Sequence, residues 1–401
     1  MDQAKPDLFN SQAADAGMLG ILQPQPGQLP ELIQHWRGPR PLRVCSGGTT
    51  SRAAVDQGWT LDLREHFSQV HWDEADRTVL IEGGCRMGDV LAALLPYGRT
   101  ITAGLSGLPG VGYVLTGGMG PLSRQVGLAV DNLQEIQGIW GNGDSFLLKR
   151  EQHLGSAEWR GLCGAAPFLA VVEKLRLTTQ PLQALWIDQS SGRPEQLPDW
   201  MEEAEQFASG SSLQWHWQGS GTLQRMRISS TEEPVSQRIE GLHQLPPLAA
   251  KPDFPQRLHG EVLGLLGPAG VASWRTVLPQ LSTLMLRCPH PGCSLSCQQI
   301  GAATGRESVD VTSFVHRDAM WKPWITAVWP AGDEPARQRA LAWLEELWGL
   351  LQPLCPGVHL AQLHDHLPFH QRELEQAFGT WLAGLRRLKA DRDPDGNLPS
   401  L

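Results

Sequence analysis

The chain has 401 residues, which is enough for two domains, and its formal net charge is −9 with no basic run. This charge argues against nucleic acid and against an anionic membrane surface as partners. No apolar run approaches the roughly 20 residues of a membrane span, and the N-terminus lacks the apolar core of a signal peptide. The seven scattered cysteines indicate free thiols of a reducing compartment, so we expect a cytoplasmic protein.

The first half of the chain is predicted to form strand pairs with interspersed helices. Residues 1–24 are a polar segment, and a short helix follows at Leu29–Trp36. The next elements are expected in this order: strand Leu42–Cys45, strand Trp59–Leu63, a hairpin ending in strand Thr78–Glu82, helix Asp89–Leu95, a hairpin over 133–150 and strand Phe168–Leu177. This pattern predicts an α+β domain and not the regular βαβ alternation of a dinucleotide-binding fold. No G-x-G-x-x-G lies between a strand and a helix.

After Thr179 the glycine clusters become fewer, and helices alternate with strands over residues 180–355. The expected elements are antiparallel strands at 213–221 and 223–230, a helix at 271–286, strands at 294–305, 312–318 and 321–330, and a helix at Pro335–Leu351. A last helix is expected at Arg372–Lys389. We interpret residues 180–355 as a second domain.

Two glycine-rich stretches are candidates for ligand contact. Residues 102–132 hold eight glycines and few side chains capable of acid–base chemistry. Glycine is needed where the backbone takes positive φ or where a ligand approaches it closely. Earlier in the chain, the amides of Gly47–Thr49 and the hydroxyls of Thr49–Ser51 form a plausible nest for a diphosphate, to which Arg52 could add charge. Glycine-rich corners and an ordinary strand–turn are the alternatives.

Five segments occur in the order typical of one protein family: SGGTTSR, EGGCRMGDVLAAL, GLPGVGYVLTGGMGPLSRQVGLAVDN, TSFVHRDAMWKPWITAVW and LRRLKADRDPDGNL. With these motifs the chain resembles the PCMH-type, FAD-binding oxidoreductases of the vanillyl-alcohol-oxidase superfamily, in their berberine-bridge-enzyme-like branch. The resemblance covers residues 20–398. Five motifs in one order favour this fold far more than any one of them alone.

The resemblance implies a division of the chain and an activity. A PCMH-type FAD-binding domain of two subdomains would cover residues 25–179. A substrate domain with a central antiparallel sheet would cover residues 180–355, and the segment 356–401 would return to the first domain. The implied enzyme is an FAD-linked oxidase or dehydrogenase. Its substrate would be a small alcohol, sugar or secondary metabolite that passes a hydride to FAD, and oxygen or another electron acceptor would then reoxidise the flavin.

The same resemblance implies which residues contact FAD. They are Ser46, Gly47, Gly48, Thr49, Thr50, Ser51, Gly104, Leu105, Pro109, Gly112, Tyr113, Thr116, Gly117, Gly118, Gly120, Ser123, Asp131 and Val171. Many relatives attach FAD covalently through a His after the Gly-Gly and a Cys in the next glycine segment. Thr49 and either Leu105 or Ser106 stand at these positions here. We therefore expect FAD to be bound non-covalently.

The chain also departs from the family at its catalytic positions. Gln298 or Gln299 stands where relatives often carry a catalytic Glu, and an amide cannot take a proton as a carboxylate does. No tyrosine follows Tyr113, so the usual phenolate base is absent. We expect His364 and Asp365, with Gln298, to supply the catalytic groups, because a His near neutral pKa is a suitable base. A polar surface loop at His364 is the alternative, as is a flavin-binding module of this fold without catalysis.

Two further clusters have competing interpretations. The run CPHPGCSLSC invites a zinc site, but its cysteines lack the paired C-x-x-C spacing, and we expect buried thiols and no metal. Trp321, Trp324 and Trp329 could line a pocket for an apolar or aromatic substrate. Core packing is the alternative for most of them.

Overall fold

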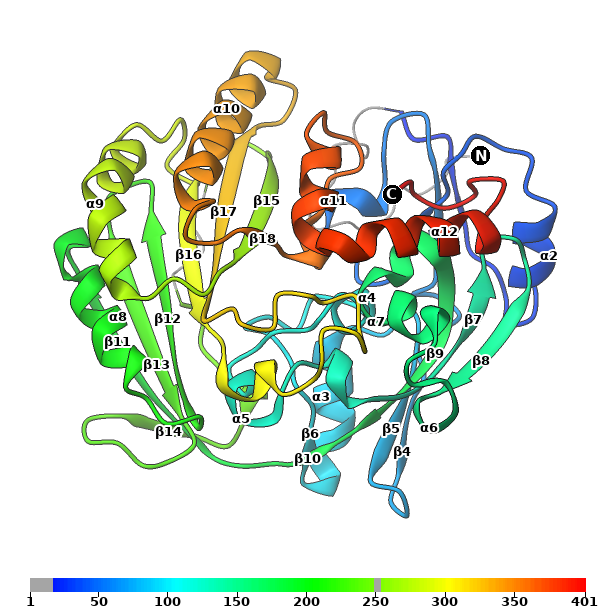
Figure 1. Cartoon of the computed structure of the whole chain (residues 1–401), viewed down its shortest axis with the longest axis horizontal. Coiled ribbons are helices and arrows are strands. Elements are labelled where there is room, and N and C mark those ends of the chain that lie inside the picture. The colour runs from blue at the N-terminus through cyan, green and yellow to red at the C-terminus, as the bar shows by residue number, and fades with distance from the viewer. Residues whose placement is uncertain (1–16, 249–253) are drawn as a thin grey trace.

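The computed structural model describes residues 17–248 and 254–401. It consists of two lobes side by side (Figure 1). One lobe contains the described chain up to Thr178 and also carries the C-terminal helices, and the other contains a large antiparallel sheet. The predicted α+β class and the central antiparallel sheet are both confirmed.

The first lobe contains two main sheets. The smaller is parallel with the order β1-β3-β2, formed by Gly20–Leu22, Trp59–Asp62 and Arg43–Cys45. The larger is antiparallel with the order β4-β5-β9-β7-β8, formed by Val70–Asp73, Thr78–Glu82, Ala170–Thr178, Leu133–Trp140 and Ser145–Lys149. Because β1 pairs with β3, the lobe begins before residue 25, inside the segment predicted as a separate polar region. Residues 1–16 lie outside the described residues.

Short helices connect and cover these sheets. They are α2 Leu29–Gln34, α3 Met87–Leu94, α4 Gly112–Leu115, α5 Ser123–Val126, α6 Arg150–His153 and α7 Ala157–Leu169. The Ser156 side chain caps α7 by accepting a hydrogen bond from Trp159 N, and the helix is kinked at Gly164, whose φ is +136°. Phe168 belongs to this helix, so the strand predicted from Phe168 begins two residues later, at Ala170. A short ladder of β6 Arg99–Thr100 with β10 Gln180–Pro181 leads to the second lobe.

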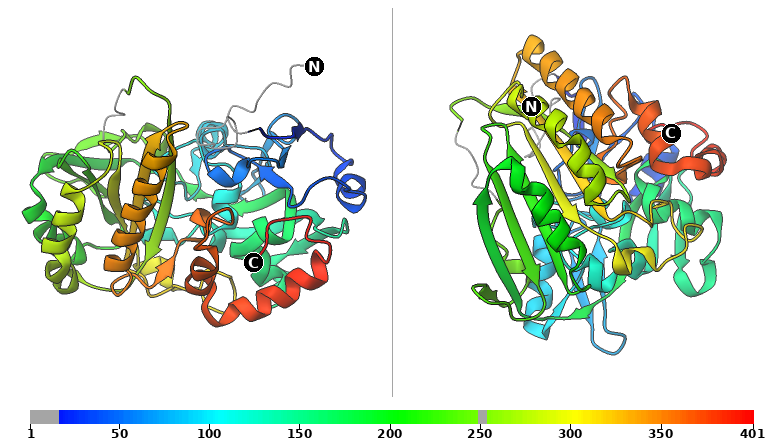
Figure 2. Two further views of the ribbon diagram at one scale, coloured as in Figure 1. Left: turned by 90° about the horizontal axis from the view of Figure 1, so that it is seen from above. Right: turned by 60° about the vertical axis from the view of Figure 1, so that its left-hand side comes forward.

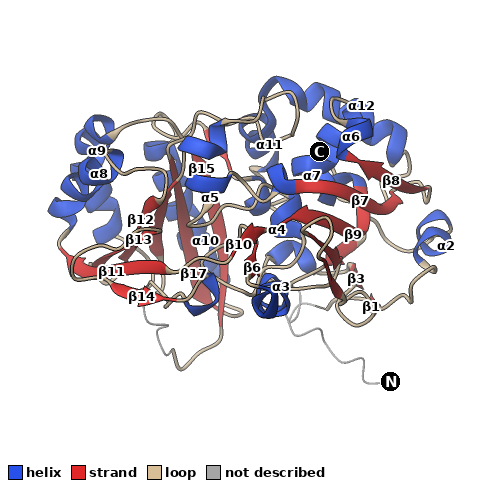
Figure 3. Cartoon of the chain, turned by 90° about the horizontal axis from the view of Figure 1, so that it is seen from below, coloured by secondary structure: helices blue, strands red, loops and turns tan. Residues whose placement is uncertain are grey.

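The second lobe is built on an eight-stranded sheet whose paired strands are all antiparallel. Its order is β14-β11-β13-β12-β16-β17-β15-β18, with the bounds Gln237–Ile239, Leu185–Gly192, Leu223–Ser229, Ser211–Gln218, Ser294–Gln299, Trp321–Pro330, Leu258–Leu266 and Gly357–Val358. Three helices, α8 Leu197–Glu205, α9 Val271–Leu286 and α10 Glu334–Leu351, cover one face (Figures 1 and 3). The other face is turned toward the first lobe.

Strand alternation gives the two faces of this sheet different characters. Along β17, buried and partly buried residues alternate without interruption. Trp215 on β12 pairs with Cys297 on β16 and packs edge-on against Trp274 of α9, so this row faces the helices. The intervening row faces the first lobe and contains Lys322 and Trp324. The sheet thus has one apolar face under the helices and one more polar face toward the other lobe.

Three predicted elements are corrected. Residues 312–318 form no strand, because their polar groups bond to helix α7 and not to the sheet: Ser313 N donates to Cys163 O and Ser313 Oγ donates to Arg160 O. The strand predicted over 294–305 ends at Gln299, and a 3-10 turn follows at Ala302–Gly305. The predicted last helix is two helices, α11 His370–Phe378 and α12 Leu382–Arg392, separated where Gly379 takes a φ of +52°.

The C-terminal segment is shared between the lobes. Strand β18 joins the sheet of the second lobe, whereas α12 packs on α7 of the first lobe (Figure 2). Asn397 holds the C-terminal tail in place. Its side-chain Nδ2 donates to Ile33 O and Gly141 O, and its backbone carbonyl accepts a hydrogen bond from Leu42 N. Within the described ranges, no helix is both long enough and apolar enough to cross a membrane.

Candidate functional site

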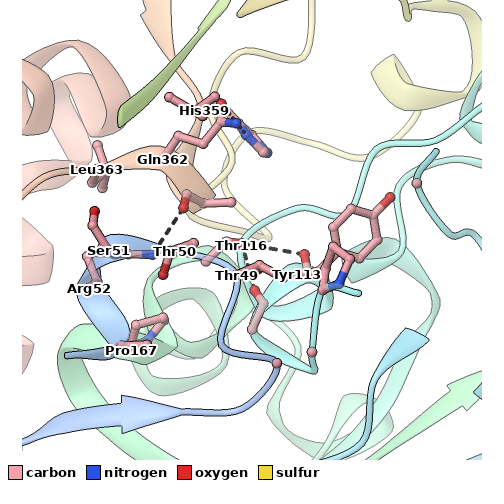
Figure 4. Close-up of a pocket in the computed structure, with 18 of the residues that line it drawn as sticks. Thr49, Thr50, Ser51, Arg52, Tyr113, Thr116, Pro167, His359, Gln362 and Leu363 are labelled. Carbon is pink, nitrogen blue, oxygen red and sulfur yellow. Dashed lines mark hydrogen bonds between the residues drawn. The ribbon is translucent and has the colours of Figure 1, made fainter. Parts of the chain in front are cut away.

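A cavity of about 370 Å³ lies between the two lobes. The first lobe contributes residues 46–53 and parts of the glycine-rich stretch. The second lobe contributes the polar face of its sheet, and the segment after β18 closes the cavity. Figure 4 shows Thr49, Thr50, Ser51 and Arg52 across the cavity from Gln362 and Leu363. The pocket therefore brings together the two glycine-rich segments that the sequence indicated.

The loop after β2 is held against the glycine-rich stretch by its own backbone. Ser46 Oγ donates to Gly83 O and accepts from Val111 N. A Cβ added at Gly47 would lie 2.2 Å from Gly110 N, so neither Gly47 nor Gly110 could be replaced by a residue with a side chain where the two backbone segments meet. Gly48 takes a φ of +71° and turns the following residues toward the cavity. Only glycine fits the close approach at Gly47, as the Gly-Gly signal suggested.

The predicted cofactor residues divide into two groups. Twelve line the cavity: Ser46, Gly47, Gly48, Thr49, Thr50, Ser51, Gly104, Leu105, Pro109, Gly112, Tyr113 and Thr116. Six do not line it: Gly117, Gly118, Gly120, Ser123, Asp131 and Val171. Gly120 packs on Ala103 O, Ser123 Oγ accepts a hydrogen bond from Gly120 N, and Val171 lies in an apolar cluster of the first lobe. Gly120, Ser123 and Val171 therefore pack within the protein and not against the cavity.

Asp131 does not line the cavity and is engaged in an ion pair and a hydrogen bond elsewhere. Its carboxylate accepts from Leu128 N, which closes its own turn, and pairs with Arg317 at 2.8 Å. The same guanidinium donates to Thr304 O, so the end of the glycine-rich stretch is tied to the segment between β16 and β17. Asp131 therefore has a structural role in this fold.

The sheet face of the cavity carries a row of polar side chains. Gln214, Gln298 and Lys322 are direct neighbours on β12, β16 and β17. Gln298 is 2% exposed and lines the pocket, and its Nε2 has no hydrogen-bond partner among the described residues. Lys322 Nζ lies 4.7 Å over the ring of Trp324, which also lines the pocket. Trp321 and Trp329 are buried in the core, so only Trp324 of the three tryptophans considered in the sequence reaches the cavity.

His359 begins the segment that follows β18 and lines the cavity. Its Nδ1 lies 3.4 Å from Gln362 Oε1, and its Nε2 has no partner in the described part of the chain. Burial, together with the positive charges of Lys322 and Arg52, lowers the pKa of His359 well below its ordinary value. The ring is therefore neutral at physiological pH. A neutral ring with an open nitrogen can accept a proton.

His364 also lines the cavity but is already engaged on both sides. Its Nδ1 lies 2.6 Å from Glu373 Oε1, and its Nε2 lies 3.4 Å from Glu261 Oε2. Burial disfavours the charged ring, but the charge of Glu373 and the hydrogen bonds to both carboxylates outweigh it and raise the pKa of His364 to about 10. The ring is thus an imidazolium at neutral pH. It cannot serve there as the general base predicted from the sequence.

Asp365, another of the predicted catalytic residues, does not line the cavity. It forms a buried ion pair with Arg43. Burial alone would raise the pKa of its carboxyl, but the hydrogen bond to His366 and the charge of Arg43 outweigh burial and lower that pKa. Glu261 is the centre of the neighbouring network: it accepts a hydrogen bond from Ser51 Oγ, and His366 Nε2 lies 2.8 Å from its Oε1. This network joins the loop of the first lobe to strand β15. Of the three predicted catalytic residues, Gln298 and His364 line the cavity and Asp365 does not, and none of them is an available base.

Several pocket residues were not predicted as site residues, and four of them carry polar groups used below: Glu261, Lys322, His359 and Gln362. A signal for His359 existed, because the run HLAQLHDHLPF that was considered for the base begins with it. The alternation along β17 could also have placed Lys322 and Trp324 on one face. Glu261 and Gln362 carry no comparable signal, since only the tertiary fold brings them to the cavity.

Comparison with known proteins relates the glycine-rich segments of the first lobe to a known cofactor-binding domain. Residues 28–146 match the family model of an FAD binding domain, and this range includes the loop after β2 and the whole glycine-rich stretch. This segment of the chain is therefore a PCMH-type FAD binding domain. The fold of the chain is that of the berberine-bridge-enzyme-like branch, as the sequence motifs implied.

Two solved structures show how far the likeness in fold extends along the chain. Chitooligosaccharide oxidase matches with a TM-score of 0.78 at 18% identity, over 94% of this chain and 89% of that one. Berberine bridge enzyme from Eschscholzia californica matches with a TM-score of 0.76 at 18% identity, over 95% of this chain and 88% of that one. At this identity the likeness establishes the fold.

The curated relatives align over a shorter stretch. Aclacinomycin-N/aclacinomycin-A oxidase of Streptomyces galilaeus is 42% identical over 101 residues, which is 24% of this chain and 18% of that protein. The chain spans about a fifth of the length of the first curated relatives that it matches.

The residues of the cavity fit FAD. The loop 46–51 offers backbone amides and hydroxyls beside the glycine cradle, which suits a diphosphate. Gly112 lines the cavity with nothing within 4 Å of an added Cβ, so the backbone is open to a ligand there. Tyr113 Oη, Gln298 Nε2 and His359 Nε2 have no partner in the described residues, and these buried polar atoms need one.

Proposed function

We propose that this protein is an FAD-dependent oxidoreductase that holds FAD non-covalently and oxidises a small organic substrate in the cavity between its lobes. The matched relatives are FAD-linked oxidoreductases and oxidases, and they support an enzyme. The observation that carries the proposal is the neutral His359 with its open nitrogen in a cavity built from the FAD-binding loop. This arrangement favours an enzyme over a binding module without catalysis.

Bound FAD would supply the hydride acceptor, and the protein's task is to position substrate and cofactor and to move the proton. Oxidation of an alcohol or amine releases a proton from oxygen or nitrogen. His359 Nε2 is placed to accept that proton when Nδ1 donates to Gln362 Oε1. Burial, aided by the positive charges of Lys322 and Arg52, lowers the pKa of His359 and keeps the ring uncharged before the proton arrives. Gln362 is then a positioning residue for His359.

The imidazolium of His364 has a different task. It neutralises Glu261 and Glu373, which would otherwise be two buried negative charges near the cavity. Ser51 donates to Glu261, so the same network fixes the loop that would hold the diphosphate. Apolar side chains of Leu105, Val262 and Trp324 line much of the remaining surface and exclude water.

Non-covalent attachment is supported by the residues at the two usual linkage positions. Thr49 and either Leu105 or Ser106 line the pocket there, and none of them forms a histidyl or cysteinyl bond to flavin. Oxygen or another acceptor would regenerate the oxidised cofactor. The seven free cysteines agree with a reducing compartment, and on this ground we propose a cytoplasmic location.

The test is the rate of anaerobic flavin reduction by a panel of alcohols, sugars and amines, followed by the absorbance of the bound flavin. With a substrate in hand, His359→Ala is expected to slow flavin reduction by about 10²-fold or more, because general base catalysis contributes about that much. The flavin spectrum should stay unchanged. The control is His71→Ala, at an exposed histidine of β4. The flavin of this variant should be reduced by substrate at the wild-type rate.

Two outcomes would contradict the proposal. If bound flavin is reduced by no compound of the panel, the binding module is the better reading. If the substrate reduces the flavin of His359→Ala as fast as that of the wild type, the proton acceptor is another group.

A further inference from the structure

The cavity contains a cation that the protein itself does not neutralise. Lys322 projects from β17 into the pocket, and its side chain forms no hydrogen bond or ion pair with any residue in the ranges 17–248 and 254–401. Its contact is the ring of Trp324. The carboxylate of Glu261 lines the same cavity but is taken up by Ser51, His364 and His366.

A second unsatisfied group lies directly beside it. Gln298 pairs with Lys322 across β16 and β17, so both side chains leave the same face of the sheet. Gln298 is 2% exposed, and its Nε2 is unpartnered among the described residues. A buried polar group without a partner costs free energy, and a ligand group that satisfies both side chains would recover it.

We propose that Lys322 and Gln298 bind a carboxylate of the substrate, with the Trp324 ring against the carbon atoms beside it. The inference rests on the proposed function and narrows it: the substrate is a small carboxylic acid that also carries the alcohol to be oxidised. An ammonium and an amide N–H suit the two oxygens of a carboxylate, and charged hydrogen bonds are stronger than neutral ones.

The reaction balances with the groups already named. Bound FAD would supply the acceptor for the hydride, with its two electrons, from the alcohol carbon, and His359 Nε2 would accept the hydroxyl proton. The C–H and O–H bonds would break and a C=O bond would form, so the oxidation of the alcohol would be balanced by the reduction of FAD. The carboxylate stays unchanged on Lys322 throughout. Its role is to fix the orientation of the alcohol in the cavity.

Benzoate and its neutral analogue benzamide test the anion site on the FAD-loaded protein. Their dissociation constants are measured from the change that each causes in flavin absorbance. In the wild type, benzoate is expected to bind at least about 10-fold more tightly than benzamide. Lys322→Met should raise the dissociation constant of benzoate by about 10-fold or more and change that of benzamide by less than about twofold. Lys322→Arg keeps the charge and should retain most of the affinity for benzoate.

Lys149→Met is the matched control, because Lys149 is 43% exposed on β8 and pairs with Glu135 away from the cavity. It should leave both constants unchanged. An equal affinity for benzoate and benzamide, or a benzoate affinity that survives Lys322→Met, overturns the inference. If FAD remains bound and reducible in that case, the proposed function stands. A protein that binds no FAD defeats the proposed function and the inference together.

Discussion

At the residue scale, His359 and His364, five positions apart, have opposite charge states. His364 lies between two carboxylates, whereas His359 has cations near it and no carboxylate in hydrogen-bonding contact. Environment and not residue type sets the role of each. The sequence could show that His was present where a tyrosine base was missing, but both histidines occur in one polar run. The charge of His364 depends on Glu261 of β15 and Glu373 of α11, and only the folded structure brings these two carboxylates to it.

The charge state of His364 can be tested through stability. Its pKa is raised to about 10 from the ordinary value of 6.5, so its contribution is complete below pH 6.5 and is lost as pH rises toward 10. His364→Gln leaves two buried carboxylates without a counter-charge and should cost about 3–5 kcal/mol at neutral pH. The measurement is denaturant unfolding between pH 6 and 10. A wild type and variant that lose stability in parallel over this range would show that His364 carries no extra proton.

At the element scale, the strands and long helices follow from their sequence patterns, and the connections do not. Alternation over 321–330 and the polar turn of the β7–β8 hairpin predicted those strands correctly. The segment 312–318 has the composition of a strand, but its hydrogen bonds go to α7, a helix that the sequence did not indicate. Local pattern could not show this, because the partner lies about 150 residues earlier.

Arg124 gives an element-scale prediction for the contact between the lobes. It projects from α5 and donates to Ser211 O, Ile300 O and Phe207 O of the second lobe. Arg124→Met leaves these three carbonyls unpaired and should lower the free energy of unfolding by about 3 kcal/mol or more.

The control for Arg124 is Arg275→Met, at a surface residue whose ion pairs with Asp199 and Glu202 are exposed. It should change stability by less than about 0.5 kcal/mol. Equal effects of the two substitutions on denaturant unfolding would show that Arg124 does not hold the lobes together.

At the scale of the whole molecule, the functional site exists only because the two lobes meet. The first lobe supplies the glycine cradle and the hydroxyl-bearing loop, and the second supplies the polar sheet face and His359. The motifs in their order were enough to predict the fold and the loop. The substrate side of the cavity was harder to predict, since Glu261, Gln298, Lys322 and His359 come from four separate segments of the chain.

The most direct measurement is the absorbance spectrum of the freshly purified protein, followed by acid precipitation. We expect the bands of oxidised flavin on the native protein and the yellow chromophore in the supernatant after acid. Yellow colour retained on the pellet would contradict non-covalent binding. A colourless protein that added FAD does not restore would contradict the central claim that the cavity between the lobes is a flavin site.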